Sequence, residues 1–142
     1  MEDLSLHILD IVENSLRANA KNILIRIFMD EKTDILTLEI KDDGKGMNEE
    51  TKRSAVNPFY TSKKGKRTGL GLPLLAQSTE EAGGNLKIKS LEGKGTNVIA
   101  TFKLSHIDRK PFGNLDETMR CLKATHPEVN FHFEYDKKIM DK

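Results

Sequence analysis

Two isoleucine-rich segments separated by a short polar turn constrain the fold more than any other feature of this sequence. Residues 22–29 (NILIRIFM) and 35–41 (ILTLEIK) each predict a β-strand, and the DEKTD between them predicts a hairpin turn. Residues 4–18 carry apolar side chains at helical spacing, with Ser15 on that apolar face, and predict a helix buried on most sides. The other predicted elements, in chain order, are a helical stretch over 48–56, a loop over 57–71, a helix over 72–82, strands over 86–91 and 97–104, a helix that begins after Asn114, and a strand over 129–135.

The composition indicates one globular domain and excludes several classes of protein. The chain has 142 residues, 37% of them hydrophobic, and a domain usually has about 100–200 residues. Its 23 basic residues nearly balance 22 acidic ones, which argues against a nucleic-acid partner. No apolar run approaches the roughly 18 residues that span a membrane, and the N-terminus lacks the basic region of a signal peptide. The single cysteine, Cys121, can form no internal disulfide, so a cytoplasmic location is expected.

A polar stripe on the first predicted helix is the first candidate for chemistry. Asp10, Asn14 and Arg17 are four and three residues apart, which places them on one face. An amide oxygen can ligate Mg²⁺, a carboxylate can orient or deprotonate a water or hydroxyl, and an arginine can neutralise phosphate. A solvent-facing helix edge with an ordinary salt bridge explains the same pattern, and taken alone the stripe favours that alternative.

The second candidate is the DDGKG that follows the second strand. The glycines at positions 44 and 46 permit a tight turn and the close approach of a ligand to the backbone. A carboxylate at the end of a strand, such as Asp42, can accept a hydrogen bond from an amino group such as that of adenine. A simple Asp-Gly turn is the alternative interpretation.

The third candidate is TGLGL, residues 68–72, at the start of a predicted helix. Free N–H groups and the helix dipole favour an anion there, and four cations lie in the loop just before it. Neither the Walker nor the Rossmann glycine pattern is present. The alternative is a solvated, flexible loop that precedes a helix cap.

The order of these motifs resembles the ATP-binding domain of the GHKL superfamily, which includes DNA gyrase, the heat-shock chaperone ATPase, histidine kinases and mismatch-repair ATPases. ENSLRANAKNILIRI resembles the N box and the strand after it, and DDGKGM resembles the G1 box. NPFYTSKKGKRTGLGLPL resembles the F box, ATP lid and G2 box of a sensor histidine kinase, and GKGT the later GxGT motif. The resemblance covers residues 4 to about 104. It implies an α/β (α+β) two-layer sandwich, in which helices cover one face of a mixed, mostly antiparallel sheet and ATP with Mg²⁺ lies under a lid over 57–71.

The resemblance also implies roles for individual residues. Asn14 would hold the Mg²⁺ that bridges the phosphates, and Arg17 would contact a phosphate. Asp42 would accept a hydrogen bond from the adenine amino group, and Thr96 would support that contact. The other nucleotide-binding residues that it implies are Gly44, Gly46, Met47, Phe59, Lys63, Gly69, Leu70, Gly71 and Leu72.

Asp10 departs from the family pattern. The residue four positions before the magnesium-binding asparagine is often glutamate in the ATPases, where it activates the attacking water, and often asparagine or glutamate in the kinases. Aspartate is one methylene shorter, so its carboxylate would lie about 1 Å further from the reacting atom, and such a displacement can lower a rate about a hundredfold. Asp10 is the predicted catalytic residue. Glu13 is the second choice, because its side chain points about 100° away from that of Asn14 around the helix axis.

The resemblance predicts an ATP-binding domain over residues 1–104 and a helix–strand extension over 105–142 packed on the same domain. Because no segment for a phosphoacceptor helix precedes the N box, the first hypothesis is a histidine-kinase-like or anti-sigma-type kinase of a separate protein. The second is an ATP-driven or ATP-sensing regulatory module with slow or no hydrolysis, and either could form a homodimer. His7 is expected to pack or to face solvent. The strand over 129–135 is expected to fill a free edge of the sheet or, alternatively, to bind a partner.

Overall fold

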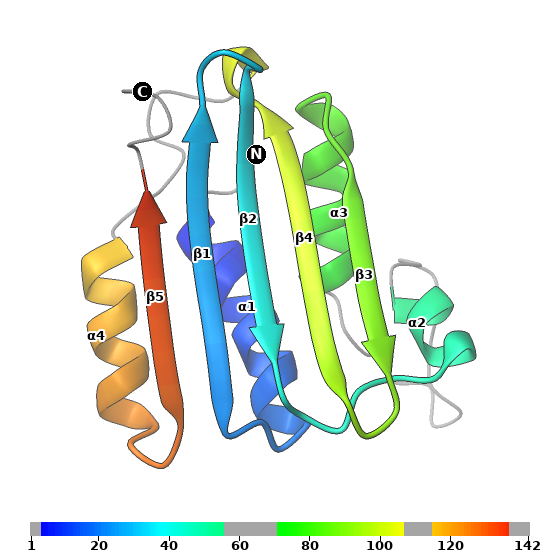
Figure 1. Cartoon of the computed structure of the whole chain (residues 1–142), viewed down its shortest axis with the longest axis vertical. Helices are drawn as coiled ribbons and strands as arrows, with labels where there is room; N and C mark the ends of the chain where they lie inside the picture. Colours follow the sequence, from blue (N-terminus) through cyan, green and yellow to red (C-terminus); the bar gives the residue numbers. More distant parts are fainter. Residues whose placement is uncertain (1–3, 56–70, 107–114, 137–142) are drawn as a thin grey trace.

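The computed structural model describes residues 4–55, 71–106 and 115–136, and in these ranges the chain forms one five-stranded sheet. The strand order is β3-β4-β2-β1-β5, as Figure 1 shows. The β1–β2, β2–β4 and β3–β4 pairs are antiparallel, whereas β5 runs parallel to β1. The sheet is therefore mixed and mostly antiparallel, as predicted. The strands are β1 (Asn22–Asp30), β2 (Ile35–Asp42), β3 (Leu86–Leu91), β4 (Gly95–Lys103) and β5 (Asn130–Asp136).

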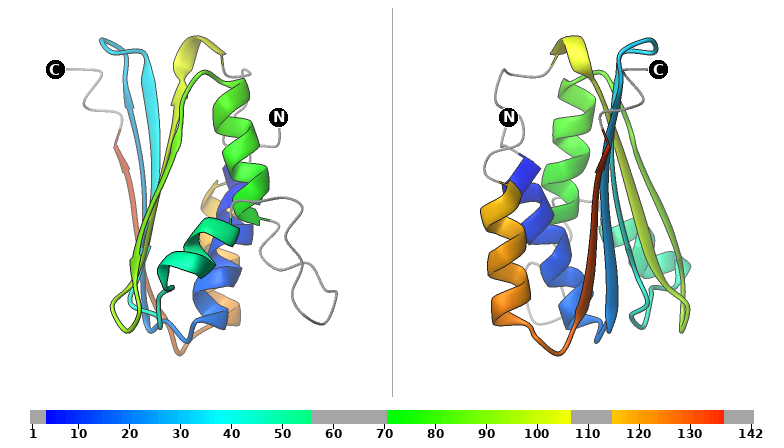
Figure 2. Two further views of the ribbon diagram at one scale, coloured as in Figure 1. Left: turned by 90° about the vertical axis from the view of Figure 1, so that its right-hand side faces the viewer. Right: turned by 60° about the vertical axis from the view of Figure 1, so that its left-hand side comes forward.

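Within the described ranges, three helices cover one face of this sheet and leave its other face open (Figure 2). They are α1 (Leu4–Arg17), α3 (Gly71–Glu81) and α4 (Leu115–Thr125). The short α2 (Glu49–Ala55) lies beside β3, and a 3-10 turn η1 (Leu104–His106) follows β4. The two-layer sandwich is thus confirmed. None of the helices in the described ranges is both long and apolar enough to cross a membrane.

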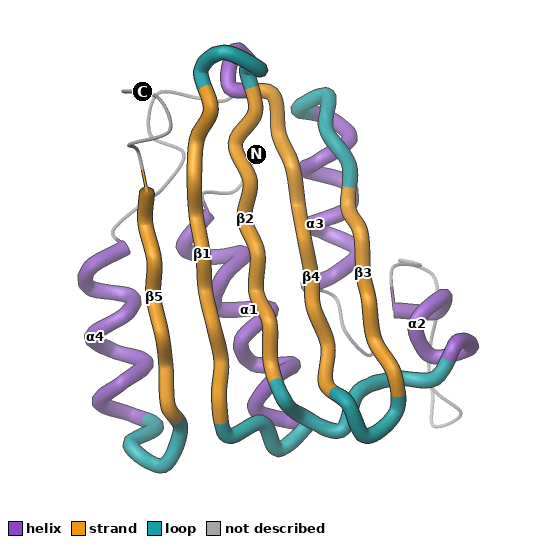
Figure 3. Tube along the Cα trace, viewed as in Figure 1, coloured by secondary structure: helices purple, strands orange, loops and turns teal. Residues whose placement is uncertain are grey.

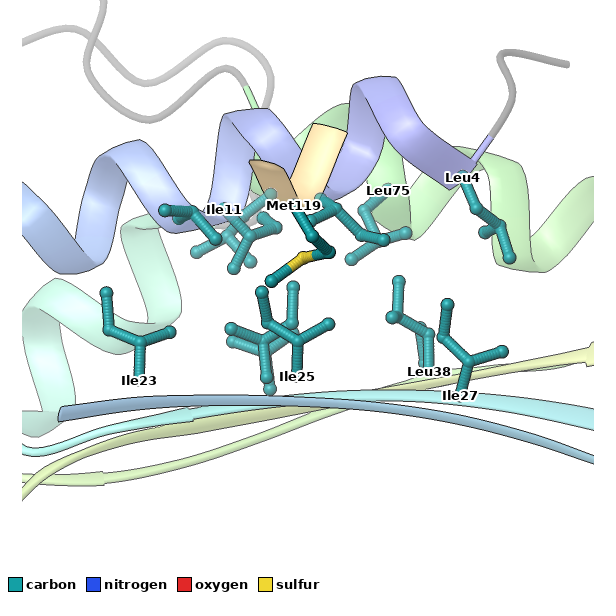
Figure 4. Close-up of a cluster of buried hydrophobic side chains, with 14 of the residues drawn as sticks. Leu4, Ile11, Ile23, Ile25, Ile27, Leu38, Leu75 and Met119 are labelled. Carbon is teal, nitrogen blue, oxygen red and sulfur yellow. The ribbon is translucent and has the colours of Figure 1, made fainter. Parts of the chain in front are cut away.

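The core lies between the helices and the sheet. Alternate residues of the strands point toward the helices, and the β1 series from Ile23 to Met29 is buried at every second position. Figure 4 shows the side chains of α1, α3 and α4 meeting those of β1 and β2 across this layer. A fully buried aliphatic or Phe side chain contributes roughly 1.5–3 kcal/mol. The largest completely buried apolar side chains are Leu4, Ile8, Val12, Ile23, Ile25, Ile27, Leu36, Leu38, Ile40, Leu75 and Phe102.

β5, the last described strand, lies at the edge of the sheet, next to β1. All seven residues of β5 pair with β1, from Asn22↔Asn130 to Phe28↔Asp136. The prediction that residues 129–135 fill a free edge of the sheet is therefore confirmed, and the structure shows that the neighbouring strand is β1. Met119 and Leu122 of α4 are buried in the main core, so the helix before β5 packs on the same layer as α1.

Among the strand boundaries that differ from the prediction, two matter for the candidate site. β4 begins at Gly95 rather than at residue 97, and β2 ends at Asp42 rather than at residue 41. Asp42 and Thr96 are consequently strand residues that face each other in register. The predicted loop over 57–71 lies almost wholly outside the described residues.

Candidate functional site

Four polar side chains gather at one end of the sheet, on the face that the helices cover. We call this the turn end, because the β2–α2 loop and the β3–β4 turn lie side by side there (Figure 3). The backbone N–H of Gly93 in the second loop donates to the carbonyl of Lys45 in the first, at 2.6 Å. The four polar residues, which we call the polar quartet, are Ser15 of α1, Asp42 of β2, Ser90 of β3 and Thr96 of β4.

Asp42 is the acceptor around which the polar quartet is arranged. Ser15 Oγ donates to its Oδ2 at 2.5 Å, and the backbone N–H of Gly44 donates to its Oδ1 at 2.8 Å. The N–H of Thr96 lies 3.3 Å from the same Oδ1. An ionised carboxylate has about four lone-pair sites, so these three donors orient Asp42 and leave acceptor capacity for a ligand. The sequence-predicted pair of Asp42 and Thr96 is therefore brought together.

Ser90 connects the glycine turn to the start of β4. Its Oγ accepts a hydrogen bond from the N–H of Met47 at 2.8 Å and donates to the carbonyl of Gly95 at 3.0 Å. It also lies 2.9 Å from Thr96 Oγ1, and because its one proton serves Gly95, the Thr96 hydroxyl is the donor in that contact. Met47, another predicted residue, thus joins the site through its backbone rather than its side chain.

The glycines of the two turns are required by contacts within the chain. Gly46 has a φ of +73°, and a Cβ there would lie 2.0 Å from the carbonyl oxygen of Leu91. Gly95 has a φ of +90°, and its Cβ would lie 2.1 Å from the carbonyl oxygen of Asp42. A Cβ on Gly44 would meet Ala18 at 2.8 Å. These close approaches explain the glycines without a ligand, and contacts of Gly44 and Gly46 with a nucleotide stay a prediction.

The neighbouring Asp43 has a structural role. Its Oδ1 accepts hydrogen bonds from the N–H groups of Lys21 and Asn22 at 2.8 and 2.9 Å, and its Oδ2 accepts one from Asn22 Nδ2 at 2.7 Å. The bonds from Asn22, first of all the side-chain one, hold the pKa of Asp43 below its ordinary value of 3.8. Asp43 therefore ties the start of β1 to the end of β2, and Asp42 is the acid available to a ligand.

The predicted polar stripe on α1 is only partly arranged as expected. Asp10 and Asn14 are half-buried, and nothing in the structure tests their predicted roles. Arg17 forms an ion pair with Glu13 at 3.5 Å, with both side chains about two thirds exposed (66% and 64%). This is the ordinary salt bridge that the sequence left open, and an exposed pair of this kind contributes about 0.2–1 kcal/mol. A phosphate contact by Arg17 stays a prediction.

Two further residues of the helical layer have defined positions. His7 is buried, as expected, and its Nε2 lies 3.1 Å from Ser78 Oγ, which links α1 to α3. Gly71 begins α3, so the N–H groups of this end point out of the helix. Leu72 is 4% exposed, so its side chain belongs to the core and only its backbone could serve a ligand. Four predicted nucleotide-binding residues lie outside the described residues: Phe59, Lys63, Gly69 and Leu70.

In the described ranges, no group of three or more His, Cys, Asp or Glu side chains is placed to hold a metal ion. Asn14 is the predicted protein ligand, and an amide oxygen is a suitable donor for Mg²⁺, which retains several waters or substrate oxygens in its shell.

Ser15 and Ser90 were missed as functional candidates in the sequence. Ser15 was assigned to the apolar face of its helix, and Ser90 had no motif of its own. A usable signal was present: each hydroxyl occupies a position where the apolar period requires a hydrophobic side chain, and a buried hydroxyl needs a hydrogen-bond partner.

Comparisons with known proteins agree with this fold. Residues 2–106 match the family model of the histidine kinase-, DNA gyrase B- and HSP90-like ATPases. The chain therefore belongs to this family, and the predicted GHKL resemblance is confirmed. The structure is also similar to the Aquifex aeolicus MutL ATPase domain complexed with ADP. The TM-score is 0.60 at 18% identity, over 96% of this chain and 61% of that one, which supports the fold.

Curated relatives are histidine kinases and sporulation kinases. Sporulation kinase C of Bacillus subtilis is 35% identical over 88 residues, which are 62% of this chain and 20% of that protein. The sensor histidine kinase YvrG of the same species is 29% identical over 98 residues, and ZraS of Escherichia coli O157:H7 is 26% identical over 106 residues. The matched segments cover 66% and 75% of this chain but 17% and 23% of those proteins. The chain thus corresponds to about a fifth of the length of these relatives.

Proposed function

We propose that the chain binds Mg-ATP at the turn end, between α1 and α3, and transfers the terminal phosphate to a separate protein in the cytoplasm. The observation that carries the proposal is the orientation of Asp42 by Ser15, Gly44 and Thr96, which leaves a fixed anionic acceptor at the end of a buried strand. Such an acceptor is complementary to an exocyclic amino group, and the family match provides adenine as the base that carries it.

The phosphates would lie toward α1 and the start of α3. Asn14 would hold Mg²⁺ together with phosphate oxygens and water, and the ion would neutralise the charge of the phosphates. The free N–H groups at the start of α3 would donate to a phosphate, because the N-terminus of a helix favours an anion. Arg17 would exchange its weak pairing with Glu13 for a phosphate oxygen.

Asp10 would act on the receiving group. It lies one helical turn before Asn14, on the same face of α1, so its carboxylate can orient or accept the proton of a hydroxyl, imidazole or water near the terminal phosphate. The buried His7, bonded to Ser78, is not suited to receive phosphate itself. The kinase names of the relatives and this burial favour an acceptor on another chain.

A second function is favoured by the identity of Asp10. A carboxylate one methylene shorter than glutamate would activate water slowly, and slow or absent hydrolysis suits a regulatory module that binds a partner when ATP is present. The module would then resemble mismatch-repair or gyrase-type ATPases in using ATP binding itself as the signal.

Incubation with γ-labelled ATP, alone and with extract of the cells that produce the protein, distinguishes these functions. Label on a second protein supports the kinase, phosphate release without labelling supports the ATPase, and ATP binding without either supports the sensor. Asp10→Asn should abolish phosphate transfer but leave ATP affinity nearly unchanged. If Glu13→Gln abolishes transfer and Asp10→Asn does not, the assignment of Asp10 is wrong.

A further inference from the structure

A row of basic side chains lies on the open face of the sheet, directly behind the polar quartet. Lys41, Asn97 and Lys89 are in register across β2, β4 and β3, one residue away from Asp42, Thr96 and Ser90 in each strand. Because successive side chains of a strand point to opposite faces, these three point away from the helices. Lys94, in the turn between β3 and β4, extends the set. We call Lys41, Lys89, Lys94 and Asn97 the lysine row.

The positive charge of the lysine row is not neutralised within the described part of the chain. Its three lysines are exposed, and none forms an ion pair with another described residue. The same face offers a contrast at Arg26, which pairs with Glu39 and with Glu134 at 3.1 Å each. The cation on β1 thus has two carboxylates within ion-pair distance, whereas Asp42 and Asp43 line the same depression as Lys41 and Lys94 without an ion pair to either lysine.

The lysine row also forms a hollow. A depression of about 170 Å³ is lined by Lys41, Lys89, Lys94 and Asn97 together with Asp42, Ser90, Leu91, Gly95 and Thr96. A second one, of about 490 Å³, shares Lys41 and Lys94 and continues toward Leu24 and His132 on the neighbouring strands. The two depressions therefore form a continuous trough across the open face.

Asn97 indicates what kind of molecule fits the trough. Its Oδ1 is buried and has no hydrogen-bond partner among the described residues, and a buried carbonyl oxygen normally accepts a hydrogen bond. An occupant must therefore offer a donor at Asn97 and negative charge at the lysines. A peptide supplies both through its backbone N–H groups and its acidic side chains, whereas a nucleic-acid backbone presents phosphate acceptors. The four residues of the lysine row include no aromatic or arginine side chain of the kind that stacks on bases, and the aromatic residues Phe131 and His132 line the trough only at β5.

We propose that the lysine row is the docking surface for an acidic segment of a partner protein. Carboxylates of the segment pair with Lys41, Lys89 and Lys94, and a backbone N–H of the segment donates to Asn97 Oδ1. The segment and the nucleotide occupy opposite faces of the same three strands, so both bind at once. Charge complementarity of this kind governs partner choice and the rate of association.

The test uses the full chain with MgATP present at saturation, so that an anionic peptide cannot bind in the nucleotide site. A fluorescein-labelled peptide of alternating glutamate and serine is titrated by anisotropy, next to the same peptide with glutamine in place of glutamate and a labelled single-stranded oligodeoxynucleotide. The lysine-row variant is Lys41→Glu/Lys89→Glu/Lys94→Glu. Its control, Lys32→Glu/Arg120→Glu/Lys123→Glu, changes the net charge equally at exposed positions elsewhere. Thermal unfolding confirms that both variants are folded.

The proposal expects the acidic peptide to bind and the lysine-row variant to lose at least about tenfold in affinity, with the control close to wild type. Asn97→Leu should weaken binding as well, without any change of charge. Equal losses in the two charge variants would attribute binding to net charge alone and overturn the proposal. Binding of the oligonucleotide in preference to the peptide, or of the glutamine peptide equally well, would overturn it too. Binding of the peptide only when MgATP is left out would place the peptide in the nucleotide site and overturn the proposal.

Discussion

The helix-facing side of the sheet has two ends with opposite chemistry. At the end that carries the β1–β2 hairpin, which we call the hairpin end, the buried side chains of the strands are apolar. At the turn end, the last helix-facing residue of three of the strands and the last sheet-facing residue of α1 are polar. On β2 the helix-facing residues are Leu36, Leu38, Ile40 and Asp42. On β4, read from its end toward its start, they are Phe102, Ala100, Val98 and Thr96. On β3 they are Leu86, Ile88 and Ser90, and on α1 the corresponding sheet-facing residues are Leu4, Ile8, Ile11 and Ser15.

The difference separates what stabilises this fold from what makes a site. Burying a polar group without a hydrogen bond costs about 1–3 kcal/mol, so four polar residues in core positions would weaken the domain if they were isolated. They are instead bonded to one another and to the turns. The hairpin end carries the stability, and the turn end retains polar groups that folding alone does not require.

Leu36→Ala should destabilise the hairpin end and produce the largest effect on the free energy of unfolding. Leu36 is completely buried opposite Phe102, so the change removes apolar contacts and leaves a cavity that costs about 2–5 kcal/mol. Chemical denaturation measures the loss. ATP affinity of the folded fraction should stay within about twofold of wild type, and a large loss of affinity would show that the two ends are not separable.

Gly95→Ala should affect both stability and binding. The new Cβ would be placed at a φ of +90° and 2.1 Å from the carbonyl of Asp42, so the turn must shift, at about 1–3 kcal/mol or more. The shift moves Asp42 and Thr96 together, and ATP affinity should fall with stability. Gly93→Ala is the matched control, because Gly93 also has a positive φ but has open space around its Cβ position. If the two variants bind ATP equally, the close approach does not position Asp42.

Ser15→Ala and Ser5→Ala compare the turn end and the hairpin end within a single helix, α1. The change removes the donor to Asp42 Oδ2 and should cost about 1 kcal/mol of stability, with a drop in ATP affinity of about fivefold. Ser5→Ala, on the same helix at the hairpin end, should lower stability without changing ATP affinity. Calorimetric titration of both variants distinguishes these results. Equal ATP affinities of the two variants would show that Ser15 does not contribute to the nucleotide site.

Asp43→Asn gives the smallest effect, and the size of that effect depends on pH. Because the pKa of Asp43 is lowered in the folded chain, its contribution to stability is complete above its ordinary value of 3.8 and is lost as the pH falls below that value. At neutral pH the variant should be less stable by about 1 kcal/mol or less, since the group is exposed. The gap between wild type and variant should close on acidification below 3.8. A gap that stays constant down to the acid transition would contradict this role.

The sequence was sufficient to predict the family, the helices and strands, and the position of β5 at an edge of the sheet. Regular alternation in β1 and β2 and helical spacing in α1 are local properties, and the motifs occur in a fixed order. The parallel direction of β5 and the extension of β4 back to Gly95 depend on long-range pairing with β1 and β2, which local patterns do not contain.

The site was predicted unevenly for a related physical reason. Asp42 and Thr96 stand in motifs and were found, whereas the role of Ser15 appears only when α1 is packed on β2. The sequence allowed an ordinary salt bridge on the edge of α1, yet it could not decide between a carboxylate, which the structure shows to be Glu13, and a phosphate as the partner of Arg17. Roles that depend on packing between elements need the folded chain.

The central claim is that the turn end holds the adenine of ATP through Asp42. Isothermal titration of MgATP into wild type, Asp42→Asn and Asp30→Asn tests it directly, because Asp30 is a comparable acid at the hairpin end. Hydrogen bonds to a charged group contribute about 1.5–3 kcal/mol, so Asp42→Asn should weaken binding at least about tenfold while Asp30→Asn binds as wild type does. Equal affinity of Asp42→Asn and wild type would contradict the account.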